Sequence, residues 1–399
     1  MNKITLKKPI IRNSRVTAVY EVEGEWREAF NRAESFYYEY TLDGKGVDLS
    51  GVPDGVLMIP LLGNILPFAW LYDAVVAAPE TDSAFLRCIS NVREGYRKMY
   101  PELEFKGTLS VEKEIPAKNV DEEGGSAVFF SGGADSWYSL VSHLSEKPLM
   151  VTVYGADIPL TDAVGIENAG KLARETAGRL GLSLLEIRTN MRGFLVYKPL
   201  LDMVAPTGDA WWHGFQHGLG INSLAAPIAY LKGLDKVYMA GSHASTDKDF
   251  VRVTCASDAS IDNHVRYAGA RVIHDGYEKT RMDKVRYLAQ HSKETGGATL
   301  RVCWEKRGGG NCCLCEKCTR TILELYACGA DPKSFGFPQA GIMALRAALY
   351  RNRLQSHDKS IVIDYIDAQN ALKETMKTDR RLWPLGRFLK EDYSRDLVK

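Results

Sequence analysis

Residues 127–136 constrain the fold of this chain more than any other stretch of its sequence. Four apolar residues, 127–130, predict a buried strand, and a Ser-Gly-Gly turn then leads directly into a helical pattern at 137–144. The unpaired backbone N–H groups and the dipole at such a helix start attract anions. Because Gly132 and Gly133 carry no side chain, the backbone can close onto a phosphate there.

Three polar side chains complete this segment. Ser131 and Ser136 can donate hydroxyl hydrogen bonds to phosphate oxygens. Asp135 would repel a bare phosphate, so it fits either as a helix cap or as a carboxylate that faces Mg²⁺. No Gly-Lys-Ser or Gly-Lys-Thr follows the glycines, which sets a Walker-type loop aside. The remaining alternative is a Gly-Gly turn that caps an ordinary helix.

Apolar strands alternate with helical patterns as far as residue 302. The predicted strands after the first are residues 149–154, 182–187, 237–240 and 299–302. The predicted helices between them are residues 162–180, 214–231 and 281–294. This alternation predicts an α/β fold, a doubly wound and mostly parallel sheet that is covered by helices on both faces.

In such sheets the ligand lies beyond the carboxyl ends of the strands, near the point where strand order reverses. Tyr154 and Gly155 follow the second predicted strand, where we expect contacts to adenine or ribose. Gly241, Ser242 and His243 follow the fourth, with a mixture of glycine and polar groups that suits a substrate or phosphate pocket. The alternative for each is a solvated loop built from turn residues.

Two further regions flank this core. Residues 1–118 are predicted as a separate α+β domain, with strands at 16–22 and 36–40 and helices at 62–78 and 83–99. Its expected role is substrate selection, a lid, a partner surface or plain structural support. Residues 112–126 are predicted as a linker, 119–330 as the core domain, and 331–399 as a helical C-terminal region with helices at 343–354 and 362–376.

Composition narrows the classes of partner and compartment. The 51 basic and 50 acidic residues leave a net charge of +1, which gives no bulk electrostatic argument for nucleic acid or an anionic membrane. The polar N-terminus does not resemble a signal peptide, and the apolar run at 55–78 is too interrupted for a membrane span. Five of the eight cysteines lie between Cys303 and Cys318, which favours a metal site in a reducing compartment over disulfides. We therefore expect a cytoplasmic protein.

The cysteine cluster has the spacing of a metal knuckle. Cys303, Cys312, Cys315 and Cys318 can turn four thiolates onto one tetrahedral Zn²⁺ at about 2.3 Å each. Four sulfur ligands leave no open coordination position, so the metal is expected to be structural. An iron–sulfur cluster is the competing interpretation. Cys313 is the surplus thiol and is expected to point away from the metal.

The Ser-Gly-Gly-Ala-Asp-Ser segment at 131–136 resembles the PP-loop of the ATP pyrophosphatases. That resemblance implies an adenine nucleotide alpha hydrolase-like fold and an enzyme that splits ATP between the α and β phosphates. Residues 280–289 are similar to the segment in which many PP-loop enzymes carry a phosphate-contacting lysine, here Lys284. A compact ammonium group suits a pyrophosphate leaving group. A solvated helix lysine is the alternative.

The PP-loop and the four-cysteine knuckle together resemble the 7-cyano-7-deazaguanine synthase family, over residues 128–325. That family adenylates a carboxylate and lets ammonia attack it. Its Pro-Asp-Cys-Arg segment would fall near residues 257–260, where only Asp258 is kept. The family also lacks counterparts of residues 1–118 and of the C-terminal region, so the chemistry carries over better than the substrate.

The resemblance implies an AMP-forming carboxylate–amine ligase that uses ATP, Mg²⁺ and Zn²⁺. Its expected partners are a small-molecule carboxylate, such as 7-carboxy-7-deazaguanine, and ammonia or another amine, including a protein N-terminus. Asp135 and Lys284 are the predicted catalytic residues. No membrane or nucleic-acid partner is expected, and a homodimer is compatible with this organisation. The alternatives are a PP-loop sulfurtransferase that uses Cys313 or Cys255 to thiolate tRNA or a small molecule, and a non-catalytic nucleotide-binding assembly subunit.

Overall fold

The computed structural model describes residues 2–118, 124–249, 252–353 and 359–392. Its strands form one twelve-stranded sheet in the order β11-β12-β10-β7-β8-β9-β3-β2-β1-β5-β6, with β4 (Lys45–Gly46) paired to β3. The central parallel strands are β12 (Ala270–Asp275), β10 (Leu234–Ala240), β7 (Gly125–Phe129), β8 (Leu149–Tyr154) and β9 (Leu184–Thr189). The prediction of an α/β fold with a mostly parallel sheet is confirmed.

The order of the central strands reverses next to β7. The chain runs outward from β7 to β8 and β9, and then returns to the other side of β7 for β10 and β12. The carboxyl ends of β7 and β10 therefore lie side by side at the switch point, where open α/β sheets bind ligands.

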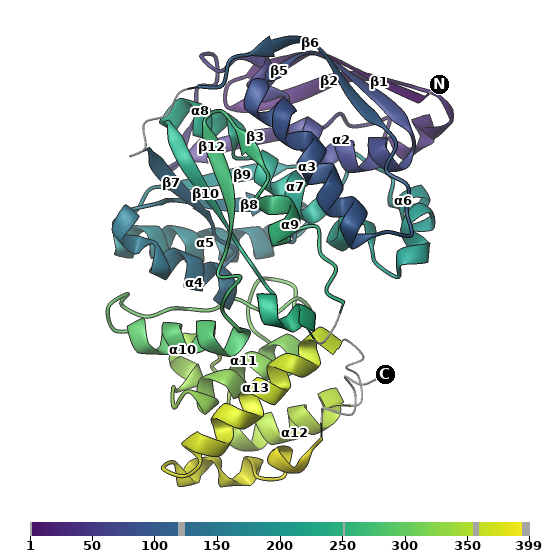
Figure 1. Cartoon of the computed structure of the whole chain (residues 1–399). Helices are drawn as coiled ribbons and strands as arrows, with labels where there is room; N and C mark the ends of the chain where they lie inside the picture. Colours follow the sequence, from purple (N-terminus) through teal and green to yellow (C-terminus); the bar gives the residue numbers. More distant parts are fainter. Residues whose placement is uncertain (1, 119–123, 250–251, 354–358, 393–399) are drawn as a thin grey trace.

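The N-terminal strands extend the same sheet (Figure 1). They join it where β3 (Tyr37–Leu42) pairs antiparallel with β9. The other N-terminal strands are β1 (Asn2–Arg12), β2 (Arg15–Glu23), β5 (Ala74–Asp82) and β6 (Thr108–Ile115). One apolar core runs from Val76 in β5 to Val151 in β8. The predicted domain boundaries stay predictions, and residues 119–123 at the first of them lie outside the described residues.

Helices cover both faces of the central strands. In β7, Ala127 and Phe129 point into one apolar core, and Val128 points into the other. The first core is covered by α2 (Ile59–Leu71), α3 (Ser83–Met99), α7 (His217–Ser223) and α8 (Ala226–Lys232). The second is covered by α4 (Ala134–Ser142), α5 (Ala163–Leu180), α10 (Arg281–His291) and α11 (Glu316–Ala327). This alternation of buried side chains is the period of two expected of a strand covered on both sides.

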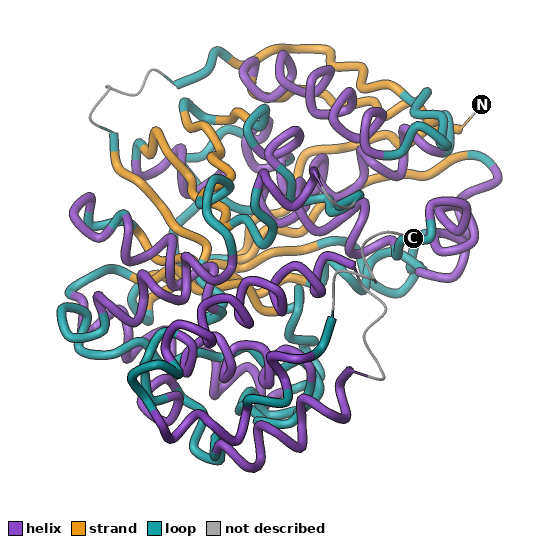
Figure 2. Tube along the Cα trace, turned by 60° about the horizontal axis from the view of Figure 1, so that its bottom comes forward, coloured by secondary structure: helices purple, strands orange, loops and turns teal. Residues whose placement is uncertain are grey.

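The C-terminal helices α12 (Ile342–Arg353) and α13 (Lys359–Thr375) pack against α11 and form a further layer beyond α4 and α10. Figure 2 turns this layer toward the viewer. The shorter elements are α1 (Asp54–Leu57), α6 (Tyr197–Val204), α9 (Ala259–Asp262) and β11 (Arg266–Tyr267). The prediction of helices after residue 330 is confirmed for the described part of that region.

Two predicted elements are wrong. The single helix predicted at 62–78 ends at Leu71, and residues 74–82 form β5 in the middle of the N-terminal strands. Asp73, with a φ of +49°, separates the two elements. Because most of this helix and strand is buried, their hydrophobic pattern does not distinguish them.

The predicted last strand at 299–302 is also wrong. These residues are extended but outside the sheet, because the Leu300 N–H donates to the Phe335 carbonyl (3.0 Å) and the Arg301 N–H to the Gly132 carbonyl (2.7 Å). The fifth parallel strand is instead β12, which follows a tight Ala268-Gly269 turn from β11. The chain segment at 299–302 is thereby anchored on the Ser-Gly-Gly turn.

Candidate phosphate site and metal centre

The Ser-Gly-Gly turn closes on itself between β7 and α4. Ser131 Oγ accepts a hydrogen bond from the Gly133 N–H (3.3 Å), and Ser136 Oγ donates to the Gly133 carbonyl (3.0 Å). Gly132 has a φ of +81°, which L side chains rarely adopt. The two serines predicted to bind phosphate therefore lie together, with their hydroxyl oxygens 3.2 Å apart.

The start of α4 presents unpaired donors. Gly133 is the N-cap and has no side chain with which to satisfy them. Within the described part of the chain, the N–H groups of Ala134, Asp135 and Ser136 have no hydrogen-bond acceptor. Such groups, at the positive end of a helix, are suited to binding phosphate oxygens.

Asp135 lies in a buried ion cluster rather than acting as the helix cap. Its Oδ2 is 2.6 Å from Arg281 Nη1, and its Oδ1 is 3.8 Å from Lys284 Nζ. Both cationic side chains are almost fully buried, at 5% and 1% exposure. Burial acts to raise the pKa of Asp135, but the charges of Arg281 and Lys284 outweigh it and hold that pKa below its usual range. Asp135 is thus ionised at neutral pH.

Helix α11 supplies the next layer of this cluster. Thr321 Oγ1 accepts from Arg281 Nη2 (3.1 Å), and Glu324 Oε2 lies 3.3 Å from Arg281 Nε. Burial raises the pKa of Glu324, which weakens its neutralisation of Arg281. Burial, and then the charges of Arg281 and Arg320, lower the pKa of Lys317, so this lysine lies in the same positive field. Arg320 is paired with Glu316 and Asp364, whereas Arg281, Lys284 and Lys317 share, among the described residues, only Asp135 and Glu324, so the cluster is short of negative charge.

Arg301 adds a further cation on the turn itself. Its Nε and Nη2 donate to the Ser131 carbonyl at 3.2 and 3.0 Å. Burial lowers the pKa of the Arg301 guanidinium, yet it remains far above neutrality in proteins. The turn that exposes unpaired N–H groups is thus bordered by cations on more than one side.

The loop after β10 meets this cluster. Lys284 Nζ donates to the Gly241 carbonyl at 2.5 Å, which fixes the ammonium group between the ends of β7 and β10. Ser242 is exposed, and His243 is partly exposed with its Nδ1 3.9 Å from Asp247. The structure therefore brings Gly241 and Lys284 to the predicted site, and places Ser242 and His243 at the rim of the loop.

Asp258 is buried and has its own partners. It caps α9 by accepting from the Ser260 N–H (2.9 Å), and it is 2.6 Å from Lys248 Nζ. Burial acts to raise the pKa of Asp258, but the hydrogen bonds from Lys248 and Ser260 hold it below its usual range. These contacts account for the carboxylate without a substrate, so a substrate role for Asp258 stays a prediction.

The predicted nucleotide contacts after β8 differ in character. The Tyr154 hydroxyl donates to Glu186 (2.7 Å), so this buried side chain is turned toward α5 and β9. Gly155 has a φ of +96°, and a Cβ there would lie 1.7 Å from the Thr189 carbonyl. Gly155 therefore permits close contact between the ends of β8 and β9, and Tyr154 supports that edge of the sheet.

The four predicted metal ligands come together. The Sγ atoms of Cys303, Cys312, Cys315 and Cys318 all lie within 4.8 Å of one another, a group that could hold a metal ion such as zinc. The Cys303–Cys315 and Cys312–Cys318 sulfur distances are 3.8 and 3.9 Å. Four bonds of about 2.3 Å in a tetrahedron require sulfur separations near these values. Cys313 is not part of this group, and its backbone has a φ of +60°.

Backbone N–H groups point at the cluster sulfurs. Lys306 donates to Cys303 Sγ (3.3 Å), and Cys315 donates to Cys312 Sγ (3.2 Å). Such bonds stabilise thiolates and orient metal ligands. The donor set of four clustered, partly or fully buried sulfurs thus fits a structural Zn²⁺.

Sequence reasoning missed Arg281, Arg301 and the place of Lys317. Arg281 was within the lysine-bearing segment, three residues before Lys284 and so on the same helix face. Arg301 lies in the segment predicted as a strand, and Lys317 lies between two of the predicted metal ligands. The sequence signal that these three residues share is a basic side chain located after the strands of the core.

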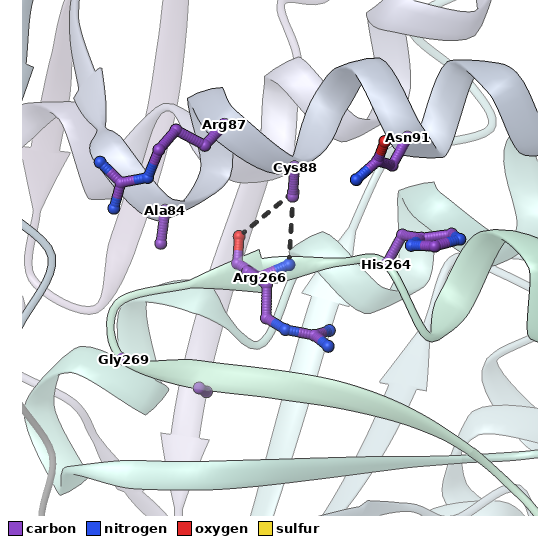
Figure 3. A pocket seen from close by; sticks show the side chains of 8 residues that line it. Ala84, Arg87, Cys88, Asn91, His264, Arg266 and Gly269 are labelled. Atoms are coloured by element: carbon purple, nitrogen blue, oxygen red, sulfur yellow. Dashed lines mark hydrogen bonds between the residues drawn. The ribbon is translucent and has the colours of Figure 1, made fainter.

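A hollow elsewhere on the molecule is unrelated to this site. It has a volume of about 380 Å³ and lies between α3 and the β11–β12 turn, with Arg87, Cys88 and Arg266 at its wall (Figure 3). Burial raises the pKa of Cys88 to about 11, so its thiol is unreactive at neutral pH. The hollow is at the amino end of β12, opposite the edge that carries the Ser-Gly-Gly turn.

Comparisons with models of known families, with curated proteins and with solved structures found no match to this chain. Of the helices in the described residues, none is both long and apolar enough to cross a membrane. The function must therefore be argued from the geometry of the site.

Proposed function

We propose that this chain is an AMP- and pyrophosphate-forming ligase that adenylates a carboxylate and transfers the acyl group to an amine. The observation that carries this proposal is the cluster at the switch point. There the unpaired N–H groups of residues 134–136 lie beside Arg281 and Lys284, in a site short of negative charge. A triphosphate supplies the missing charge.

ATP would place its β and γ phosphates on the Ser-Gly-Gly turn. The N–H groups of residues 134–136 and the hydroxyls of Ser131 and Ser136 would bind the oxygens, with Arg281 and Lys284 beside them. A substrate carboxylate at the loop after β10 would attack the α-phosphorus in line. Lys284, fixed by the Gly241 carbonyl, would stabilise the charge that grows on the departing pyrophosphate.

A magnesium ion also fits this site. Asp135 Oδ1 is buried and has no hydrogen-bond partner within the described residues, which leaves one hard oxygen ligand beside the phosphate position. When bound, Mg²⁺ would neutralise phosphate charge. Zn²⁺ on the four cysteines would be structural, since no coordination position stays open.

The test is product analysis with ATP, Mg²⁺ and a panel of carboxylic acids, beginning with 7-carboxy-7-deazaguanine. We expect acid-dependent exchange of labelled pyrophosphate into ATP, and AMP as the nucleotide product once an amine is added. The amine panel includes ammonia and a peptide with a free N-terminus. Accumulation of ADP, or nucleotide binding without exchange for any acid, would contradict the proposal.

Two lysine variants sharpen the assay. Lys284→Met should lower exchange by about 10²-fold or more, since it removes a cation that acts on the leaving group. Lys279→Met is the matched control, because Lys279 is exposed and lies just outside α10. Wild-type exchange in Lys284→Met would remove this residue from the mechanism.

A further inference from the structure

A second reactive cluster lies outside the phosphate site. His213 and His217 are four residues apart on one continuous helical stretch, formed by a π-helical turn at Trp212–Gln216 and by α7. Cys255 lies beside this stretch, and both imidazoles act on its thiol.

The backbone holds Cys255 against this helix. The Ala256 N–H donates to the His213 carbonyl at 2.8 Å. The Ala256 carbonyl is so close to Gly218 that a Cβ on that residue would come within 1.8 Å of it. These two contacts, one at His213 and one at Gly218, fix the backbone of Cys255 beside the helix that carries both imidazoles.

Asp209 orients His213. Its Oδ1 is 2.9 Å from His213 Nδ1, and its Oδ2 accepts from the Tyr100 hydroxyl (2.7 Å) and from Thr254 Oγ1 (2.9 Å). With both oxygens bonded, the carboxylate cannot rotate away from the imidazole. A thiol, an imidazole and an orienting carboxylate are the three parts of an activated cysteine nucleophile.

The electrostatics agree with this geometry. Burial acts to raise the pKa of Cys255, but the neighbouring His213 and His217 outweigh it and lower that pKa to about 6. The hydrogen bonds to Asp209 and Cys255 raise the pKa of His213 to about 10. Cys255 and His213 therefore form a thiolate–imidazolium pair at neutral pH. His217, Tyr96 and Tyr100 also interact electrostatically with Cys255, and Asp157 and Asp262 act on His217.

This pair is distinct from the other thiols. Burial raises the pKa of Cys328 to about 12. The group of described residues that could hold a metal ion is the four-cysteine one, which does not include Cys255 or its histidines. His213 is 52% exposed at its side chain, while Cys255 lies just beneath the surface at 8%. His213 is therefore open to solvent, whereas the sulfur is almost covered.

The thiol and the phosphate site share one polar region at the carboxyl edge of the sheet. Asp157, in the loop after β8, accepts from Trp212 Nε1 (3.3 Å) and acts electrostatically on His217. The same carboxylate acts on Arg301, whose side chain binds the Ser131 carbonyl. Asp157 therefore links the surroundings of the thiol to those of the Ser-Gly-Gly turn.

We propose that Cys255 accepts the acyl group from the acyl adenylate as a thioester, before the amine receives it. This inference rests on the proposed ligase function and adds a covalent step to it. The Cys255 thiolate attacks the acyl carbon, a C–S bond forms, and the C–O bond to AMP breaks, so that AMP leaves with the electron pair. His213, which is no longer paired with a thiolate, releases its proton to water.

The second half of the reaction restores the pair. The amine attacks the thioester carbon, a C–N bond forms, the C–S bond breaks, and His213 takes the proton that the amine loses. The net change is acyl adenylate plus amine to amide, AMP and one proton. His213 and Asp209 are positioning residues here, and Cys255 is the residue that contacts the reacting carbon.

The test traps the intermediate on the full chain. Protein, ATP, Mg²⁺ and the acid are mixed without amine, quenched in acid and analysed by intact mass spectrometry. We expect a mass gain equal to the acid minus water, located on Cys255 by peptide mapping and released by hydroxylamine. Cys255→Ser should lack this thioester and form amide about 100-fold more slowly. Cys328→Ser is the matched control and should behave as wild type.

The outcomes separate this inference from the ligase proposal. Pyrophosphate exchange by the wild type without any adduct on Cys255, or wild-type amide formation by Cys255→Ser, overturns the thioester step alone. No exchange with any acid overturns both proposals. A mass gain of one sulfur atom on Cys255 in the presence of a sulfur donor, with no acyl adduct, overturns it in favour of sulfur transfer.

A spectroscopic readout needs no substrate. The ultraviolet absorbance of the thiolate, taken as the difference between wild type and Cys255→Ser, should rise with pH around a midpoint near 6. His213→Gln should move that midpoint toward the ordinary cysteine value of about 8.5. A midpoint already near the ordinary value in the wild type would contradict the activated thiol.

Discussion

Replacing Asp135 with asparagine tests whether the buried ion cluster holds the Ser-Gly-Gly turn in place. The carboxylate is 17% exposed and faces Arg281 and Lys284, which are 5% and 1% exposed. Removing one partner of a buried ion pair typically costs about 3–5 kcal/mol. Asparagine still accepts a hydrogen bond, and Glu324 stays beside Arg281, so we expect the lower end, about 3 kcal/mol.

That loss changes the unfolding equilibrium more than a hundredfold, because about 1.4 kcal/mol is a factor of ten. Urea unfolding followed by circular dichroism at pH 7 measures it. Since the pKa of folded Asp135 is lowered, its stabilisation is fully present above the ordinary carboxyl pKa and is lost as pH falls through the lowered one. The difference between wild type and variant should therefore shrink in acid.

A second measurement repeats the unfolding of wild type and variant in the presence of pyrophosphate. The variant leaves Arg281 and Lys284 undercompensated, so an added polyanion should raise its unfolding midpoint more than that of the wild type. A ligand at about 100 times its Kd contributes about 2.7 kcal/mol. Glu374→Gln, which breaks an exposed ion pair with Lys377, is the control and should change little. A variant that unfolds at the wild-type urea concentration would refute the ion-cluster argument.

Three further outcomes are expected. Gly155→Ala should lower the midpoint of thermal unfolding by several degrees, because the new Cβ would lie 1.7 Å from the Thr189 carbonyl oxygen. Gly178→Ala is the control: it has open space around it in α5 and should stabilise the fold by about 0.5–1 kcal/mol. Elemental analysis should find one zinc per chain, lost in Cys315→Ser and kept in Cys313→Ser. The rate of amide formation should rise with pH through about 6, as Cys255 ionises; a rate that is flat through pH 6 would contradict the thiolate step.

The fold was predictable where short-range signals and long-range packing agree. The strand–turn–helix at 127–136 is correct because an apolar run, a glycine turn and a helical period lie in succession. Helix α3 matches its predicted range of 83–99, because one face of it is buried and the other is solvated. Because α2 and β5 are buried almost throughout, the sequence shows only a continuous apolar stretch there. The break between them comes from the backbone of Asp73, which has a φ of +49°.

The site divides in the same way. The Ser-Gly-Gly turn is formed by one short stretch of sequence, and so is the cysteine knuckle. Residue types and spacing within each stretch therefore predict how its side chains lie. Arg281, Lys317 and Arg301 come from separate segments that tertiary packing alone brings to Asp135 or the turn. Cys255 is predictable only as a spare thiol, because its histidines lie about forty residues earlier in the sequence.

The link between the metal centre and the phosphate site leads to a final prediction. Cys318 and Thr321 lie one turn apart on α11, and Thr321 accepts a hydrogen bond from Arg281. A metal on the cysteines therefore fixes the helix that positions Arg281. Removing the metal with a chelator should weaken nucleotide binding, measured by calorimetry. Thr321→Val breaks the same link downstream, so it should weaken binding while its zinc content stays normal. Unchanged affinity in both samples would show that α11 does not position Arg281.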